Sequence, residues 1–265
     1  MPLRAICPEN VQGFKRSMID AGAGVQTQIK VLGNLSALLG KAVELQRINA
    51  NPCAIVRRPK LRKERPQIPA SEAVSALLAA CKTDPDRLLV ALMAFGGLRP
   101  QEALALTKAD IGKQMISITK AMKIDGIGGT KTNAERDVPI NADLAPYLED
   151  LPDGPLFVGT RSGAQWTTHS FRNWRKRVFQ PACVAVGLGV ITEEDGKRSY
   201  TGLTPYHLRH HAASAMLIGG LDPLRTAAAM GHSPAVLYSI YAHPLREARG
   251  CTLGAQTPSA TESAQ

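Results

Sequence analysis

The sequence has no apolar run that approaches the length of a membrane-spanning helix. Its first ten residues, MPLRAICPEN, also lack the apolar core of a signal peptide. Both absences argue against a membrane protein and against export. We therefore expect the protein to stay in the cytoplasm, where it is made.

Cysteine is sparse, and its placement excludes two further classes. The five cysteines are odd in number and widely scattered, with no CxxC pair and no Cys/His cluster at metal-ligand spacing. We therefore expect reduced thiols rather than a disulfide framework or a zinc site. The chain also lacks an acidic cluster of the kind that holds catalytic metal ions, a glycine-rich phosphate motif and an internal repeat. No metal and no cofactor are expected.

Positive charge, by contrast, is in excess. The 32 Lys and Arg outnumber the 22 Asp and Glu, which gives a formal net charge of +10. Such a balance suits a polyanionic partner and favours a nucleic acid. Charge alone does not name the partner, because ribosomal proteins, membrane-surface proteins and many other soluble proteins are basic as well.

Composition and periodicity divide the chain into four regions. Apolar residues at helical spacing predict helices over 11–21 and 26–48, inside a first, helical unit. A basic linker follows, then the main folded unit, then a small and polar tail that we expect to be disordered. The four regions are residues 1–56, 57–66, 67–248 and 249–265.

The linker holds six basic residues, one acid and two prolines, which favours an extended and exposed segment. Such a segment is most often a solvated connection, but it also neutralises phosphates when a nucleic acid passes beside it. We favour the second interpretation. The residues expected to contact phosphates are Arg57, Arg58, Lys60, Arg62 and Lys63.

A second basic segment, FRNWRKRV at 171–178, combines an aromatic anchor, Trp174, with several basic side chains. It predicts an amphipathic helix. A surface helix pinned by Trp174 and a helix that contacts a nucleic-acid backbone fit this pattern equally well. Arg172 and Arg175 are the candidate contacts.

The main unit is expected to contain both helices and short strands. A helix over 86–95 is apolar all round and therefore belongs to the core. Two strand-like runs follow at 115–119 and 136–140, and the glycine-rich loop between them places Lys131 near a hairpin tip. Residues 187–202 carry little pattern and are predicted to be a loop.

Arg99 lies at the start of another predicted helix, because Pro100 follows it and Glu102 occupies the first turn near a capping-box position. The N–H groups and dipole of a helix N-terminus attract an anion, and arginine adds a fork of donors. Arg99 is thus a candidate phosphate ligand. Taken alone, the pattern fits a surface arginine salt-bridged to Glu102 equally well.

The most informative stretch is 206–243, which predicts three short helices. Two glycines end the first helix, and Asp222 and Ser233, each followed by a proline, begin the next two. Tyr241 lies about two turns into the last helix, on nearly the same face as its start. We therefore expect His232 and Tyr241 to face one site.

Four motifs, in this order along the chain, resemble those of the tyrosine recombinases, the family of phage integrases and chromosome-dimer resolvases. They are GLRPQE around Arg99, a lysine ahead of a strand at Lys131, YHLRH around Arg209, and a GH pair with a tyrosine nine residues on, at His232 and Tyr241. The resemblance covers residues 70–245. One position departs from the pattern, because Tyr206 stands where the family usually has histidine.

The resemblance implies a mostly α fold with a small antiparallel β-sheet (α+β). A tyrosine-recombinase-like catalytic domain would follow a short helical core-binding domain. Family members carry a longer helical domain at this place, so we expect the chain to begin inside it. The activity implied is site-specific DNA recombination, as in the integration or excision of a mobile element, by metal-free transesterification through a 3′-phosphotyrosine.

The resemblance also implies a role for each side chain of the site. Tyr241 would attack the phosphorus, and Arg99 and Arg209 would bind its nonbridging oxygens. Lys131 would protonate the departing 5′ oxygen, with Lys120 and Lys123 as nearby alternatives, and His232 would bind the phosphate or orient the tyrosine. Whether Tyr206 or His207 fills the usual histidine role stays open, and we favour Tyr206 as a hydrogen-bond donor to phosphate. The catalytic set is Arg99, Lys131, Tyr206, Arg209, His232 and Tyr241.

The partners implied are double-stranded DNA attachment sites and three further copies of the chain, in a homotetramer on paired sites. Accessory DNA-bending or directionality proteins are further candidates. Two other interpretations remain open: an enzyme like the type IB topoisomerases, which shares the chemistry but relaxes supercoils, and an inactive DNA-binding remnant.

Overall fold

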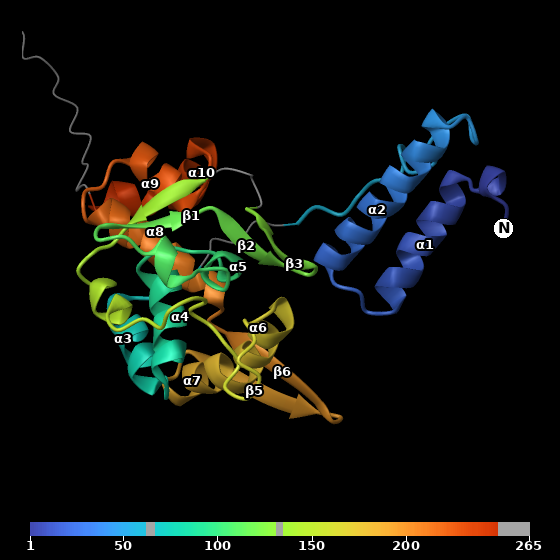
Figure 1. The fold of residues 1–265 in the computed structure, drawn as a ribbon. Coiled ribbons are helices and arrows are strands. Elements are labelled where there is room, and N and C mark those ends of the chain that lie inside the picture. Colours follow the sequence, from blue (N-terminus) through green and yellow to red (C-terminus); the bar gives the residue numbers. More distant parts are fainter. Residues whose placement is uncertain (62–66, 131–134, 249–265) are drawn as a thin grey trace, which may run out of the picture. The chain divides into compact units, whose positions relative to one another are not determined.

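The structure is a computed structural model, and it describes residues 1–61, 67–130 and 135–248, with the side chains of the last helix described as far as Tyr241. The chain divides into two compact units, Met1–Glu64 and Arg65–Gln265 (Figure 1). In the part of the chain so described, no helix is both long and apolar enough to cross a membrane.

The smaller unit is a helical hairpin of α1 (Pro8–Asp20) and α2 (Val25–Glu44). The two predicted helices are confirmed, but α2 ends four residues earlier than expected, because Gln46 adopts a left-handed conformation (φ 53°) that a helix cannot continue. Its small core joins the hairpin to the segment that follows. The core residues are Val11, Leu32, Leu39, Cys53 and Val56.

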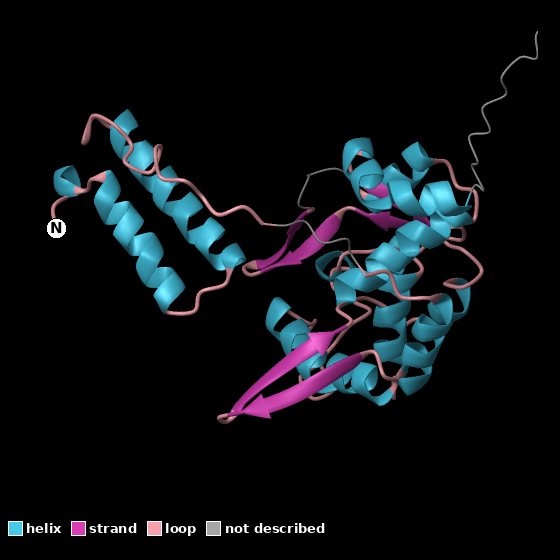
Figure 2. Cartoon of the chain, turned by 180° about the vertical axis from the view of Figure 1, so that it is seen from behind, coloured by secondary structure: helices cyan, strands magenta, loops and turns pink. Residues whose placement is uncertain are grey.

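The larger unit is mostly helical, with three small antiparallel sheets of two strands each among its described residues (Figure 2). The predicted fold class is confirmed. The helices are α3 (Ser71–Ala80), α4 (Asp84–Ala94), α5 (Pro100–Ala103), α6 (Thr168–Trp174), α7 (Gln180–Ala185), α8 (Pro205–Ile218), α9 (Pro223–Met230) and α10 (Pro234–Ala248). The strands are β1 (Met115–Ile118), β2 (Lys120–Lys123), β3 (Gly126–Gly129), β4 (Arg136–Pro139), β5 (Gly189–Glu194) and β6 (Lys197–Gly202).

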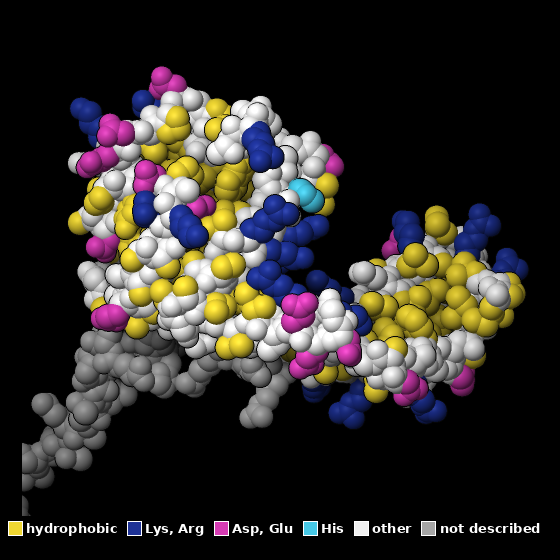
Figure 3. Space-filling view, turned by 90° about the horizontal axis from the view of Figure 1, so that it is seen from below, with side chains coloured by type: hydrophobic (Ala, Val, Ile, Leu, Met, Phe, Trp, Pro, Cys, Tyr) yellow, Lys and Arg dark blue, Asp and Glu magenta, His cyan; other side chains and the backbone are white. Residues whose placement is uncertain are grey.

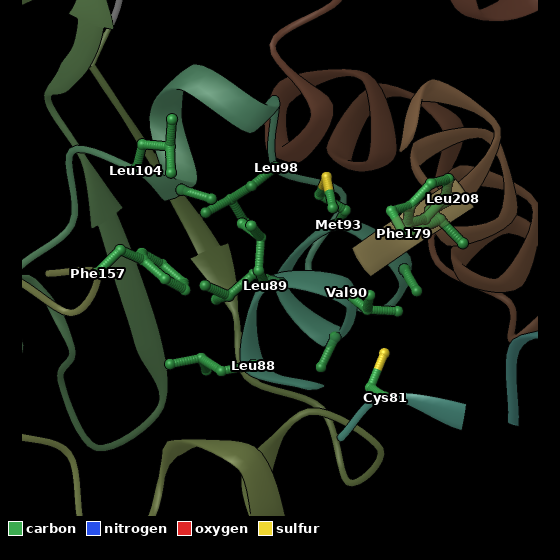
Figure 4. Packing of buried hydrophobic residues seen from close by; sticks show 14 of the residues in the cluster. Cys81, Leu88, Leu89, Val90, Met93, Leu98, Leu104, Phe157, Phe179 and Leu208 are labelled. Carbon is green, nitrogen blue, oxygen red and sulfur yellow. The ribbon is translucent and has the colours of Figure 1, made fainter. Parts of the chain in front are cut away.

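Helix α4 forms the centre of the core, as its apolar sequence predicts. From Leu88 to Ala94 every residue is buried, and Figure 4 shows side chains from this helix packed against Leu98, Phe157 and Leu208. The helix begins two residues earlier than predicted, because Thr83 caps it by accepting a hydrogen bond from the backbone N–H of Asp86 (3.4 Å).

The predicted pairing of the two strand-like runs is confirmed. Strand β1 pairs antiparallel with β4, with Ile118 opposite Arg136. The loop between them contains a second hairpin, β2–β3, that the sequence patterns did not show. Arg136 is the first residue of β4, and its pairing with β1 holds it in place. Strand β4 also contacts α9.

The prediction of a loop over 187–202 is wrong, because β5 and β6 form a hairpin there (Figure 2). The turn is Asp195-Gly196, and both residues have positive φ (50° and 68°). That combination belongs to the type I′ turn, which matches the twist of paired strands. The Asp-Gly pair was therefore a usable hairpin signal.

The predicted basic helix over 171–178 is interrupted. α6 ends at Trp174 and continues as a π-helical turn, Arg175–Phe179, before α7. The wider turn brings Trp174 and Phe179, five residues apart, onto one buried face with ring centroids 5.5 Å apart. Trp174 is therefore a core residue, and its Nε1–H donates to Asp86 (2.8 Å).

Candidate active site

The last three helices follow the predicted capping pattern. The Asp222 carboxylate accepts hydrogen bonds from two backbone N–H groups of the first turn of α9, and the Ser233 hydroxyl accepts one from Val236 (3.3 Å). Gly231 takes the left-handed conformation (φ 58°) that turns the chain between α9 and α10. The helices α8, α9 and α10 pack against one another.

The C-terminal end of α9 gathers three arginines from three distant segments. The carbonyl of Ala229 accepts a hydrogen bond from Arg136 (2.8 Å), and the carbonyl of Gly231 accepts one from Arg99 (2.9 Å). The carbonyl between them, of Met230, accepts one from Arg209. The last carbonyls of a helix lack intrahelical partners and carry the negative end of its dipole, so guanidinium groups are well placed there.

Arg209 is the most deeply held of the three, with 3% of its surface exposed. Besides the carbonyl of Met230 it contacts the carbonyl of Gly97 and the Nε2 atom of His232 (3.0 Å). Burial and the neighbouring charge of Arg99 lower the pKa of Arg209 to about 9. The side chain therefore stays charged at neutral pH.

Glu102 lies between the other two arginines. Its carboxylate accepts hydrogen bonds from both terminal nitrogens of Arg136 (3.0 and 2.6 Å), from Arg99 Nη1 (2.8 Å) and from the Arg99 backbone N–H (2.7 Å). Burial raises the pKa of Glu102, but the bonds to Arg136 and Arg99 outweigh it and hold the pKa below its ordinary value. The predicted ion pair with Arg99 is therefore real, and it is buried rather than on the surface.

Two glycines make this approach possible. Gly97 has positive φ (65°), and a Cβ atom there would lie 2.5 Å from the sulfur of Met230. At Gly231 a Cβ atom would lie 3.3 Å from Arg99 Nη1. Larger residues would push the turn before α5 and the turn after α9 apart, at the point where Arg99 spans them.

Three positive groups and one carboxylate leave the cluster of Arg99, Arg136, Arg209 and Glu102 with a formal charge of +2. His232 adds no charge at neutral pH, because burial, Arg209 and Arg99 lower its pKa to about 4. Since arginine only donates, His232 accepts from Arg209 at Nε2 and carries its hydrogen on Nδ1. The arrangement suits a phosphodiester, which is an anion with two nonbridging oxygens.

Tyr241 is fully buried between α10 and α8, and its hydroxyl lies 2.6 Å from Nδ1 of His210. Burial raises the pKa of Tyr241 above its ordinary value, while the charge of Arg209 opposes the shift. Tyr238, three residues earlier on the same helix, is 46% exposed. Of these two tyrosines, Tyr241 is therefore the one turned into the interior.

The structure places Tyr206 and His207 apart from the buried cluster. Tyr206 is 52% exposed on the first turn of α8, whereas Arg209 is buried on the same helix. His207 is engaged locally, because its Nδ1 accepts a hydrogen bond from the Thr204 backbone N–H (3.3 Å) and so caps α8. Neither has a hydrogen bond to Arg209, His232 or Tyr241.

The remaining candidates lie at the surface or outside the described residues. Arg57, Arg58, Lys60, Arg172 and Arg175 are exposed. Figure 3 shows Lys and Arg side chains gathered on one side of the larger unit. The candidates Lys131, Arg62 and Lys63 lie outside the described residues, as does the predicted tail from 249 onward.

Two side chains of the site had no role in the sequence-based prediction. Arg136 and His210 both stand inside the motifs, in the strand after Lys131 and directly after Arg209. Their importance follows from their partners, Glu102 for Arg136 and Tyr241 for His210, which lie 34 and 31 residues away. Motif membership was a signal for both residues, but it did not indicate which atom each one contacts.

Comparison with known proteins finds relatives that cover most of the chain. A tyrosine recombinase XerC of Chlamydia trachomatis serovar L2 is 27% identical over 251 residues, which cover 89% of this chain and 72% of that protein. The tyrosine recombinase XerC of Rhizobium meliloti is 29% identical over 259 residues, with the same coverage of both chains.

Solved structures share the fold at lower identity. The integrase of transposon Tn1549, in complex with a circular intermediate DNA, superposes with a TM-score of 0.72 at 16% identity, covering 91% of this chain and 83% of that one. A lambda integrase dimer bound to a COC′ core site gives 0.69 at 18% identity, covering 91% and 81%. The family model described as the phage integrase family matches residues 69–248, more than half of the chain. The protein therefore belongs to the phage integrase family, the tyrosine recombinases.

Proposed function

We propose that this chain cuts and rejoins double-stranded DNA at specific sites, with Tyr241 as nucleophile and Arg99 and Arg209 as phosphate ligands. The observation that carries the proposal is the convergence of three arginines on consecutive carbonyls, from Ala229 to Gly231, one turn before the helix that presents Tyr241. Guanidinium groups fixed in this way need little reorganisation when charge develops on a phosphate.

The reaction is a transesterification. The oxygen of Tyr241 bonds to phosphorus, the bond from phosphorus to the 5′ oxygen breaks, and that oxygen takes up a proton. Arg99 and Arg209 offset the negative charge on the nonbridging oxygens, and neutral His232 binds the phosphate or orients the tyrosine. The 3′-phosphotyrosine keeps the energy of the broken bond, so that a second strand end can be joined without ATP. Lys131 is the proposed donor of the proton.

We further propose that the active assembly is a tetramer on two paired DNA sites. Solved relatives include a lambda integrase dimer on a core site and a lambda integrase tetramer on a Holliday junction, with a TM-score of 0.65 for the latter. The exposed basic residues of the linker and of α6 would hold the DNA backbone. Accessory DNA-bending or directionality proteins would act on the same sites.

The test is covalent trapping on DNA that carries a nick next to the cleavage position. The released end of a nicked strand diffuses away, so the adduct of protein and DNA accumulates and survives denaturation. The DNA is supplied as a library of nicked duplexes with random sequence, and the recovered adducts are sequenced. A shared sequence motif among the adducts is expected, and exchange of strands between two duplexes carrying that motif should follow. Adducts without any shared sequence would instead indicate supercoil relaxation as the activity.

A further inference from the structure

The hydrogen bond between His210 and Tyr241 has no part in the chemistry assigned so far. Nδ1 of His210 lies 2.6 Å from the tyrosine oxygen, and the two ring centroids are 5.8 Å apart. Both side chains come from helices that pack together, α8 and α10. His210 directly follows Arg209, so the histidine that contacts the nucleophile and the arginine of the buried cluster share one turn of helix.

A phenol must lose its proton before its oxygen can bond to phosphorus. Tyr241 is fully buried and its pKa is raised, so the hydroxyl holds its proton at neutral pH. The positive charge of Arg209 favours the phenolate but does not accept a proton. A neighbouring base is therefore required, and it must lie within hydrogen-bond reach of the tyrosine oxygen.

We propose that His210 is the proton acceptor for Tyr241 during DNA cleavage and the proton donor to it during rejoining. The proposal deepens the proposed function and rests on it. In cleavage, the proton of the tyrosine hydroxyl moves to Nδ1 of His210 as the oxygen bonds to phosphorus and the 5′ oxygen departs. In rejoining, the 5′ oxygen of a strand end bonds to phosphorus and returns its proton to the group that donated one in cleavage. The bond from phosphorus to the tyrosine oxygen breaks, and the proton returns from His210 to that oxygen.

The surroundings of His210 suit this role. Burial, with the neighbouring His207 and the charge of Arg209, lowers the pKa of His210, so its ring is neutral at neutral pH and able to accept a proton. Of the other histidines near it, His207 is engaged by the Thr204 backbone and His232 by Arg209. Among the described side chains, only His210 makes a hydrogen bond to the Tyr241 hydroxyl.

If His210 served only to position Tyr241, replacing His210 with asparagine should leave the cleavage rate nearly unchanged. In His210→Asn the amide oxygen lies close to the place of Nδ1 and still accepts the hydrogen bond from Tyr241, but it does not take up a proton. We expect single-turnover cleavage of a trapped nicked duplex to be about 10²- to 10⁴-fold slower in His210→Asn, as for loss of a general base. Binding of the same duplex should be unchanged. The matched control is His169→Asn on the exposed surface of α6, which should cleave like the unsubstituted protein.

The pH profile gives a second and independent readout. The unsubstituted protein should cleave faster as pH rises and should reach a plateau once His210 is neutral. His210→Asn should show no such plateau, because hydroxide then removes the proton and the rate rises about tenfold per pH unit. The profile of the unsubstituted protein also serves as the test if the variant does not fold: a rate that rises without a plateau overturns the proposal.

The outcomes separate this proposal from the proposed function. Cleavage by His210→Asn within fivefold of the unsubstituted protein, or equal losses of binding and cleavage, would show that His210 only positions Tyr241 or the helices. If the unsubstituted protein forms no adduct on any duplex of the library, the proposed function itself fails, and the role of His210 fails with it.

Discussion

The arginines of the larger unit include a buried set and an exposed set. In the buried cluster, Arg209 is 3% exposed and contacts three acceptors, and Arg99 and Arg136 share the Glu102 carboxylate. On α6 and the π-helical turn, Arg172 and Arg175 project into solvent. The first set has a fixed geometry, and the second set adapts to whatever lies beside it.

The difference matches the two tasks of an enzyme that acts on DNA. Stabilising a phosphorus transition state requires charged groups that are already oriented before the reaction begins. Burial among carbonyls and a carboxylate fixes the orientation of these groups. Burial is costly, so it is offset by hydrogen bonds to every arginine of the cluster. Holding a DNA backbone requires only mobile charges near phosphates, and these cost least when exposed. Five predictions test this division, from the largest expected effect to the smallest.

Removal of the Tyr241 hydroxyl should abolish chemistry while leaving binding in place. Tyr241→Phe keeps the buried ring but lacks the oxygen that bonds to phosphorus, so no covalent adduct should form on nicked DNA. The matched control is Tyr238→Phe, whose hydroxyl belongs to an exposed side chain. An adduct that persists in Tyr241→Phe and disappears in Tyr238→Phe would reassign the nucleophile.

Loss of the Glu102 charge should destabilise the fold and make stability depend less on pH. Because the folded-state pKa of Glu102 is lowered, its contribution is present above the ordinary pKa of a carboxyl group and is lost as pH falls through the lowered value. Breaking a buried ion pair costs about 3 to 5 kcal/mol. Urea unfolding of Glu102→Gln should show a loss of this size at pH 7 and a much smaller loss at the acid end. A loss that does not change with pH would mean that packing, not charge, is responsible.

Substitution of Arg209 by lysine keeps a positive charge but removes the planar fork. Three separate acceptors surround this guanidinium, and one ammonium group does not reach all of them. We expect single-turnover cleavage to fall about 10²- to 10³-fold, as when one donor to a transition-state oxyanion is removed. DNA affinity should change little. Arg175→Lys, on the exposed turn, is the control and should cleave normally.

Tyr206 belongs to the family motif, as Arg99 and Arg209 do, yet its side chain lies at the surface like those of the exposed arginines. If its hydroxyl donates to a phosphate oxygen when DNA is bound, Tyr206→Phe should lose one hydrogen bond to a charged group, about 1.5 to 3 kcal/mol in cleavage. His207→Ala, which removes only a helix cap, should leave the rate unchanged apart from a small loss of stability. The opposite pattern, with His207→Ala inactive and Tyr206→Phe normal, would give His207 the role.

The sequence predicted the elements of this site better than their contacts. Capping residues such as Asp222 and Ser233 act within a few residues of themselves, so their pattern was sufficient to place α9 and α10. The bonds of Arg136 to the Ala229 carbonyl and of Arg99 to the Gly231 carbonyl join segments 93 and 132 residues apart. Backbone carbonyls have no sequence signature, and these contacts therefore required the structure. The hairpin β5–β6, by contrast, was missed although its Asp-Gly turn was visible.

The smallest effect is expected from the exposed set. Each phosphate that a DNA-binding protein neutralises adds about 0.9 to the steepness with which log affinity falls against log salt. Arg172→Ala with Arg175→Ala should therefore reduce that slope by about 2, and it should slow cleavage only at high salt, where binding limits the reaction. The same pair of alanines leaves the buried cluster untouched, so cleavage of DNA already bound should proceed at the normal rate. Fluorescence anisotropy with a labelled duplex between 50 and 200 mM salt, roughly the range over which electrostatic binding to DNA weakens, measures the slope. An unchanged slope would mean that these arginines only solubilise a helix whose anchor is Trp174, and that the DNA is held by other charges.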